Sequence, residues 1–342
     1  QVATPQNPSP DLPHEAYLTA LASLDQVGPA RMRWLLSFGS PEMVWHLLRA
    51  GKIRNPPAQL AVKPPQRTEW IAQANSADPQ QIWSACCALG VGVVSLGSPG
   101  YPPALAADID PPVVLFHLGN PDLLSSPSVA IVGTRRATGY GLRVAEELGA
   151  GLAEAGVMVV SGLALGIDAA AHFGALSVGT SGAAVAAVVG SGLHAPCPVR
   201  NRKLASRVAS SGVIFSEVPP EVSGAPWRFP VRNRILAALS DAVVVVESPG
   251  AGGSMHTVRE ALTRDIPVLS VPGPIDSRAS EGTNRLLSDG AEPCLGVDDV
   301  LMAIGLGGKK ANTSASSPIP SQPDTRPVPD ETGERALATI GW

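Results

Sequence analysis

Apolar residues follow two different patterns along this chain of 342 residues. From Glu15 to about Ala50 they recur every three or four positions, as in Leu18, Leu21 and Leu24, which predicts amphipathic helices. From residue 82 onward they form short continuous runs separated by helix-length segments. Such runs are typical of parallel strands buried on both faces. The predicted strands are 91–96, 113–118, 129–132, 157–160, 184–189, 213–215, 242–246 and 268–271.

The predicted fold class is therefore α/β, with a doubly wound, Rossmann-like, mostly parallel sheet and a small N-terminal helical domain. We expect a disordered N-terminus over 1–12, a helical domain of SAM or helix-hairpin-helix type over 13–80, and the Rossmann-like domain over 81–304. A Gly/Ser/Pro-rich stretch predicts a linker over 305–330. Residues 331–342 resume a helical pattern and predict the start of a truncated C-terminal domain.

Composition narrows the class of protein. Hydrophobic residues make up 44% of the chain, yet no apolar run is long enough to cross a membrane. The polar, Pro-rich N-terminus lacks the features of a signal peptide. The 4 cysteines have neither metal-ligand nor disulfide-framework spacing. We therefore expect a cytoplasmic protein with reduced thiols, no membrane partner and no bound metal.

The formal net charge of −4 argues against nucleic acid, but the charges are unevenly distributed. Between residues 128 and 240 there are ten Lys/Arg and six Asp/Glu, a local charge of +4. A local basic patch, rather than net charge, is what phosphate contacts require.

The first predicted buried strand of the Rossmann-like sheet runs into Gly133, Thr134, Arg135 and Arg136. A glycine turn between a strand and a helix offers free N–H groups to an anion, and two arginines add charge and forked donors. The glycine spacing fits neither a dinucleotide fingerprint nor a P-loop. The alternative is a tight turn with solvated arginines.

Three further clusters follow later elements. They contain Ser161 and Gly162, then Gly190 with Asn201, Arg202 and Lys203, and finally Arg232, Asn233 and Arg234, which we expect just before a helix. Because the carboxyl ends of parallel strands share one edge of a sheet, all four clusters are expected to form one phosphate-binding site there.

For other polar features the sequence alone allows two interpretations each. Asp168 and His172 lie four residues apart, as an acid–base pair or as a capping Asp and a core-facing His. The Gly28-Pro29 turn suits either a DNA phosphate or helix packing, and the loop 248–254 suits either phosphate binding or a tight turn. We assign no catalytic residue and no cofactor.

Six ordered motifs resemble the DprA/Smf family. They are SVAIVGTR (128–135), SGLALGIDAAAH (161–172), the GSGL…NRKL region (190–204), FPVRNRILAALS (229–240), VPG (271–273) and GTNRLLSDGA (282–291). The resemblance implies a DNA-processing protein of natural transformation that protects incoming single-stranded DNA, loads RecA onto it and forms a homodimer. It also implies that Arg135 and Lys203 bind DNA and that Gly133, Thr134, Ser161 and Gly162 line the pocket. His194 and Cys197 stand where the family commonly has Asp and Tyr.

An enzyme is the alternative from another class. Pro249, Gly250, Gly252, Gly253 and Ser254, with Glu260, resemble the P-G-G-x-G-T-x-x-E loop of nucleotide phosphoribohydrolases, which cleave the glycosidic bond of nucleoside monophosphates. Here an extra residue splits the glycines and Ser replaces Thr. A nucleotide-sensing module is a third hypothesis.

Overall fold

The computed structural model describes residues 12–125, 127–179, 185–195 and 198–307. Its first part is helical, and the buried indoles of Trp45 and Trp70 lie among the leucines predicted to form its core. The elements of this part are α1 (His14–Ala22), α2 (Pro29–Leu36), α3 (Pro41–Arg49), η1 (Ala58–Leu60), α4 (Pro64–Ser76) and α5 (Pro79–Ala88).

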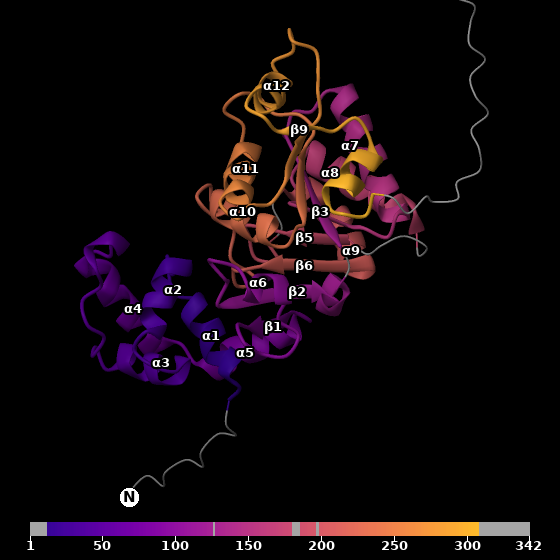
Figure 1. Cartoon of the computed structure of the whole chain (residues 1–342). Helices are drawn as coiled ribbons and strands as arrows, with labels where there is room; N and C mark the ends of the chain where they lie inside the picture. Colours follow the sequence, from indigo (N-terminus) through magenta and orange to yellow (C-terminus); the bar gives the residue numbers. More distant parts are fainter. Residues whose placement is uncertain (1–11, 126, 180–184, 196–197, 308–342) are drawn as a thin grey trace, which may run out of the picture. The chain divides into compact units, whose positions relative to one another are not determined.

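The remainder is built on a nine-stranded sheet with the order β1-β2-β6-β5-β4-β3-β7-β8-β9 (Figure 1). β1 pairs with β2 and β2 with β6 in antiparallel fashion, and every other pair is parallel. The strands are β1 (Gly92–Ser95), β2 (Val114–Gly119), β3 (Ser128–Val132), β4 (Met158–Ser161), β5 (Val185–Val188), β6 (Gly212–Ser216), β7 (Ala242–Val245), β8 (Val268–Ser270) and β9 (Glu292–Pro293).

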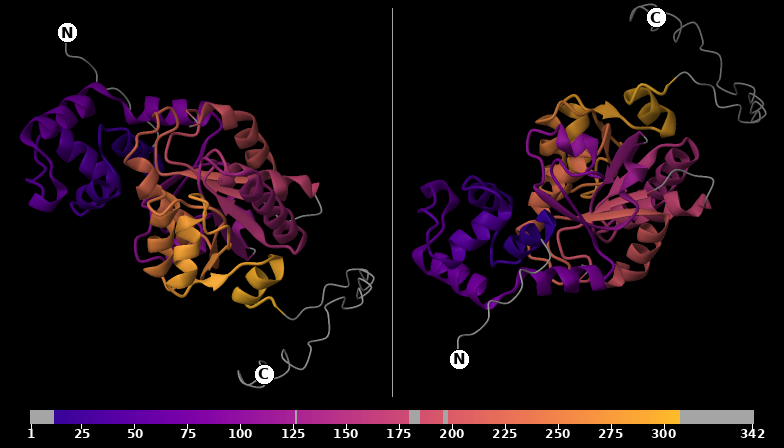
Figure 2. Two further views of the ribbon diagram at one scale, coloured as in Figure 1. Left: turned by 90° about the horizontal axis from the view of Figure 1, so that it is seen from above. Right: turned by 90° about the horizontal axis from the view of Figure 1, so that it is seen from below.

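Helices cover both faces of the sheet, as Figures 1 and 2 show. The helices and short turns of this part are α6 (Pro103–Ala106), η2 (Pro121–Ser125), α7 (Gly139–Glu154), α8 (Ile167–Ser177), η4 (Val199–Asn201), α9 (Arg202–Ser211), α10 (Arg228–Ala238), α11 (Ser254–Leu262), α12 (Glu281–Ser288) and α13 (Val297–Ala303). Alternate residues of one strand enter different cores. Val129 and Ile131 pack with α7, α8 and α9, while Ala130 and Val132 pack with α10, α11 and α12. The doubly wound α/β fold with N-terminal helices is therefore confirmed.

Two local predictions need correction. β9 has no counterpart among the predicted strands, because two exposed edge residues leave no apolar signal. Residues 229–234 lie inside α10, which begins at Arg228, rather than before a helix. Pro230 is compatible with this because a proline in the first helical turn removes no intrahelical hydrogen bond.

Several sequence predictions fall on other residues. The predicted disordered segment up to residue 11, the linker from 308 onward, the helix 331–342 and Cys197 lie outside the described residues. The predicted domain boundaries stay predictions. No described helix combines the length and the apolar character needed to span a membrane.

Candidate nucleic-acid interface

A cavity of about 440 Å³ opens where the sheet changes direction, at the carboxyl ends of β3 and β7. From β3 the chain proceeds to β4 on one side, whereas β7 lies on the other, and open α/β sheets bind ligands at this kind of crevice. The loop Gly133–Arg135 after β3 and residues Gly252–Ser254 before α11 form two of its walls, and α10 contributes Phe229, Arg232 and Asn233. We call this hollow the basic cavity.

The two loops are fixed to one another. The Thr134 amide donates to the Glu247 carbonyl over 2.7 Å, and the Thr138 amide donates to the Glu247 carboxylate over 2.9 Å. Gly133 has no room for a side chain, since a Cβ there would lie 2.7 Å from the Glu247 carbonyl oxygen. The glycine turn is therefore rigid, with its backbone close to the neighbouring loop.

Arg232 brings a buried positive charge to this cavity. The residue is 7% exposed, and its only hydrogen bond in the described chain runs from Nη2 to the Gly162 carbonyl over 3.3 Å. Nε and Nη1 are buried without a partner. Burial lowers the pKa of Arg232 to about 10, an effect that Asp168 opposes, so the guanidinium stays charged at neutral pH. A buried charge with unused donors is costly unless something pairs with it.

Arg135 stands at the mouth of the same cavity. It is exposed, and its guanidinium carbon lies 5.1 Å from the centre of the Phe229 ring, a cation–π contact that holds the charge over an aromatic face. Arg135, Phe229 and Arg232 also line an adjoining hollow of about 60 Å³ together with Gly162. Two arginines and one aromatic residue thus line the same opening.

Asp168 is an acidic residue in the lining of the basic cavity. Burial raises the pKa of Asp168, although Arg232 and the Ala164 amide oppose the shift. His172, one turn along α8, is fully buried with neither ring nitrogen hydrogen-bonded. Burial, with Arg232 adding to it, lowers the pKa of His172 to about 3. His172 is thus a neutral core residue rather than one half of an acid–base pair.

The start of α11 adds two free donors. In the described chain the amides of Gly253 and Ser254 donate to no protein acceptor, as expected at a helix N-terminus. Both residues line the basic cavity. Backbone N–H groups and two arginines therefore face one space, which is the donor set that phosphate oxygens require.

Comparison with known proteins shows the relationship. Residues 92–305 match the family model of DNA recombination-mediator protein A. The chain belongs to the DprA/Smf family. A DNA processing protein DprA of Mycobacterium tuberculosis is 41% identical over 235 residues, which cover 67% of this chain and 59% of that relative's length.

Two solved family structures resemble this one. The DprA structure from Streptococcus pneumoniae has a TM-score of 0.69 and 29% identity, over 84% of this chain and 96% of that one. The Helicobacter pylori DprA structure, which concerns the single-stranded DNA binding mode of that protein, has a TM-score of 0.56 and 30% identity, over 63% and 95%. The resemblance inferred from the sequence motifs is confirmed.

The fold brings part of the predicted family site together. Gly133, Thr134, Arg135, Arg232 and Asn233 line the basic cavity. Gly162 lines the adjoining hollow. The side-chain amide of Asn233 has no hydrogen-bond partner in the described chain, so it is free to bind a phosphate oxygen.

Other predicted residues serve different purposes. The Ser161 hydroxyl is buried and donates to the Ile131 carbonyl over 2.6 Å. Gly190 lies behind Arg228 and Phe229 and lines a separate cavity. Arg234 is bound to Glu217 over 2.6 Å and to Asp110 over 3.1 Å. These two carboxylates neutralise the charge of Arg234. We therefore do not expect Ser161, Gly190 or Arg234 to contact phosphate.

The remaining predicted residues lie at the edge of the site. The Asn201 amide donates to the carbonyls of Leu163 and Ala164, so it holds the loop that carries Ala164 into the cavity. Arg202 and Lys203 are exposed on the first turn of α9, and Arg136 is exposed beyond Arg135. None of these three cations lines the cavity.

Sequence reasoning missed the role of Phe229. It lies within the motif that carried Arg232, and an aromatic residue among cations is the signal that would have found it. The loop 248–254, whose sequence suits either phosphate binding or a tight turn, contributes Gly252, Gly253 and Ser254 to the cavity wall.

The carboxylate of the enzyme alternative lies outside the lining of the basic cavity. Glu260, the carboxylate that the phosphoribohydrolase alternative invokes, is bound to Arg264 over 2.7 Å and does not line the cavity. Across the described ranges, no three His, Cys, Asp or Glu side chains are grouped as metal ligands.

Proposed function

We propose that this chain is a non-catalytic DNA-processing protein that binds single-stranded DNA through phosphates in the basic cavity. The observation that carries the proposal is Arg232, a buried guanidinium with two unpaired nitrogen positions on a residue that lines the hollow at the switch point of the sheet. A phosphate there would supply the acceptors that the protein does not. The single-stranded DNA binding mode described for the H. pylori relative supports the same ligand class.

A single strand suits this cavity better than a duplex. A hollow of about 440 Å³ takes one flexible backbone segment, and Phe229 and Arg135 at its mouth offer one base a stacking surface. Phosphate contacts carry no sequence information, so binding should depend on salt and little on sequence.

Family membership supports a proposal for the finer biological role. We propose that the protein protects incoming DNA in natural transformation, loads RecA onto it, acts as a homodimer and works in the cytoplasm. Two sites in a dimer would raise affinity through avidity. Retention of RecA on immobilised protein and the mass of the protein in solution test these two proposals separately.

The direct test is oligo-dT binding by the variant that carries both Arg135→Ala and Lys203→Ala. We expect at least a roughly tenfold loss of affinity with unchanged folding, since charge-assisted hydrogen bonds contribute about 1.5–3 kcal/mol each. Arg207→Ala is the matched control, because Arg207 is an exposed cation one turn from Lys203 on the same helix. A double variant that binds as tightly as the parent overturns the assignment.

The two single variants show how much each cation contributes to the loss of affinity. Arg135 lines the cavity and Lys203 does not, so Arg135→Ala should account for most of the loss. A loss confined to Lys203→Ala would place the strand over α9 rather than in the basic cavity.

A further inference from the structure

An exposed indole lies immediately next to the basic cavity. Trp227 is 46% exposed and comes two residues before Phe229, whose ring lines that cavity. Two residues of chain span at most about 7 Å. That is about two nucleotides at the duplex rise of roughly 3.4 Å per base, so a strand leaving the cavity past Phe229 would soon reach Trp227.

Trp227 forms one wall of a second hollow. This hollow, the tryptophan groove, has a volume of about 430 Å³ and lies between Trp227 and two segments of the helical part, the turn 26–31 and residues 59–60. The turn lies against the ring at Gly28, where a Cβ would be in ordinary van der Waals contact with the indole at 3.6 Å. The groove is thus large enough for a planar ring beside the indole.

The groove also has the polar groups that a nucleobase uses. The side-chain amides of Gln26 and Gln59 have no hydrogen-bond partner in the described chain, and each offers donors and an acceptor to a base edge. Arg31 lines the groove, anchored on the carbonyls of Gln26 and Leu60. No carboxylate lines it; the neighbouring Asp25 is bound to Gln73 over 2.8 Å.

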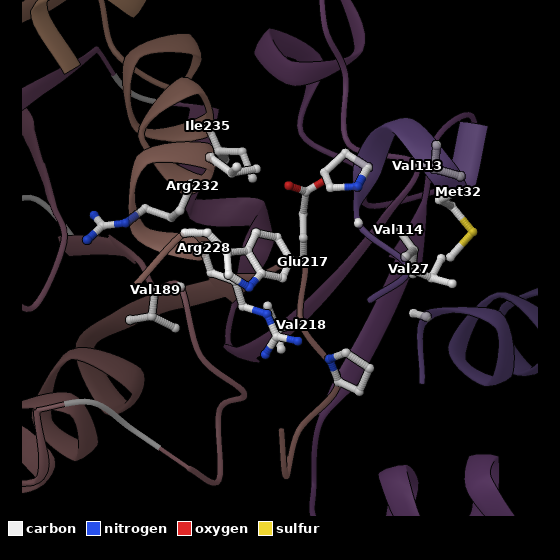
Figure 3. A pocket seen from close by; sticks show the side chains of 17 residues that line it. Val27, Met32, Val113, Val114, Val189, Glu217, Val218, Arg228, Arg232 and Ile235 are labelled. Atoms are coloured by element: carbon white, nitrogen blue, oxygen red, sulfur yellow. The ribbon is translucent and has the colours of Figure 1, made fainter. Parts of the chain in front are cut away.

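The groove and the basic cavity are neighbours, because a third cavity shares lining residues with each of them. This cavity, of about 60 Å³, is lined by Trp227 and Arg232 and by Glu217, whose carboxylate is bound to Arg234. Figure 3 shows Val27 and Met32 on one side of it and Arg228 and Arg232 on the other. The guanidinium carbon of Arg228 lies 5.0 Å from the centre of the Trp227 ring, which brings a further positive charge to the path. A polyanion with aromatic bases matches this row of cations and rings.

We propose that the tryptophan groove binds a second nucleobase of the same DNA strand, stacked on Trp227 and held at its edge by Gln26 and Gln59. The proposal rests on the proposed function, because the strand must enter through the basic cavity. It gives the turn between α1 and α2 a role in DNA binding through base contacts.

The experiment compares two oligonucleotide lengths. A dT dinucleotide is too short to place one base in the basic cavity and another about two nucleotides away, whereas a dT 12-mer can reach both sites. For the 12-mer we expect Trp227→Ala to weaken binding by roughly 5- to 160-fold, the range that follows from about 1–3 kcal/mol per stacked base. Trp227→Phe should stay close to the parent. Dinucleotide binding should be unchanged in Trp227→Ala and roughly tenfold weaker in Arg135→Ala.

Photocrosslinking supplies a second readout that does not depend on a variant. A 12-mer with 5-iododeoxyuridine at each position in turn, irradiated on the parent protein, should yield a crosslinked peptide that contains Trp227. A crosslink at Trp227 and a length-dependent loss support the proposal. No crosslink there, or equal losses for dinucleotide and 12-mer in Trp227→Ala, overturns it. If Arg135→Ala still weakens dinucleotide binding, the proposed function stands regardless.

Discussion

Replacing Arg232 with methionine should weaken DNA binding without weakening the fold. The substitution keeps an unbranched side chain and removes the buried charge. It removes one hydrogen bond, to the Gly162 carbonyl, and two unpaired nitrogen positions. A buried donor without a partner costs about 1–3 kcal/mol, and a hydrogen bond from a charged group contributes about 1.5–3 kcal/mol. Two unpaired positions cost about 2–6 kcal/mol together, so the balance lies between about 1 kcal/mol against the variant and roughly 4.5 kcal/mol in its favour.

The matched control is Arg234→Met, two residues along the same helix. The Arg234 side chain is 6% exposed, and it pairs with Glu217, 14% exposed, and with Asp110. Removing one partner of a buried ion pair costs about 3–5 kcal/mol, which at about 2–4 °C per kcal/mol lowers Tm by roughly 6–20 °C. Arg234→Met should thus be clearly destabilised, while its folded fraction still binds DNA.

Thermal unfolding and fluorescence anisotropy with labelled oligo-dT measure the two effects. For Arg232→Met we expect a Tm close to or above that of the parent, an affinity about 10- to 100-fold lower, and a salt slope smaller by about 0.7 for the lost phosphate contact. Equal destabilisation by the two substitutions, or an unchanged salt slope in Arg232→Met, would refute the reasoning. The first would mean that Arg232 holds the fold together, and the second that it does not meet phosphate.

Two further predictions concern residues beside Arg232. Burial holds the pKa of His172 near 3, below its unfolded value of about 6.5. The free energy of unfolding therefore falls as pH drops below about 6.5, by about 2 kcal/mol at pH 5. His172→Leu should therefore show a smaller fall in Tm between pH 7.5 and pH 5 than the parent, and an equal fall in both proteins would contradict this. Gly162→Ala places a methyl carbon 2.0 Å from Nη1 of Arg232, so the guanidinium must move and oligo-dT affinity should drop roughly tenfold with the fold intact. Gly296→Ala, where nothing lies within 4 Å of the new methyl, should bind as the parent does, and equal affinities for the two variants would show that the position of Arg232 is unimportant.

Most of the sheet could be predicted because its strands are buried on both faces. Runs such as Val129–Val132 and Ala242–Val246 have no polar face, and among soluble folds that pattern suits few elements other than a central parallel strand. The turn after β3 could be predicted as an anion site for a related reason, since glycine, strand end and arginines coincide at one point. The edge strand β9 gave no such signal.

The spacing of the arginines in the sequence does not show which of them face the cavity. Arg232 and Arg234 share a motif and a helix, yet one faces the cavity and the other meets Glu217 and Asp110. Two residues along a helix turn a side chain by about 200°, so once α10 begins at Arg228 the two must point in different directions. Asp110 lies more than 100 residues away in the chain, and only the tertiary fold shows that it neutralises Arg234.

The most direct test of phosphate binding in the basic cavity is a salt titration of the parent protein with oligo-dT and with a duplex of equal length. We expect the logarithm of the binding constant to fall linearly with the logarithm of salt concentration, at about 0.7 per phosphate contact, hence about 1.4 or more for Arg135 and Arg232 together. The single strand should bind more tightly than the duplex at every salt concentration. A flat salt response, or equal binding of both forms, would contradict a cavity built to hold one strand by its phosphates.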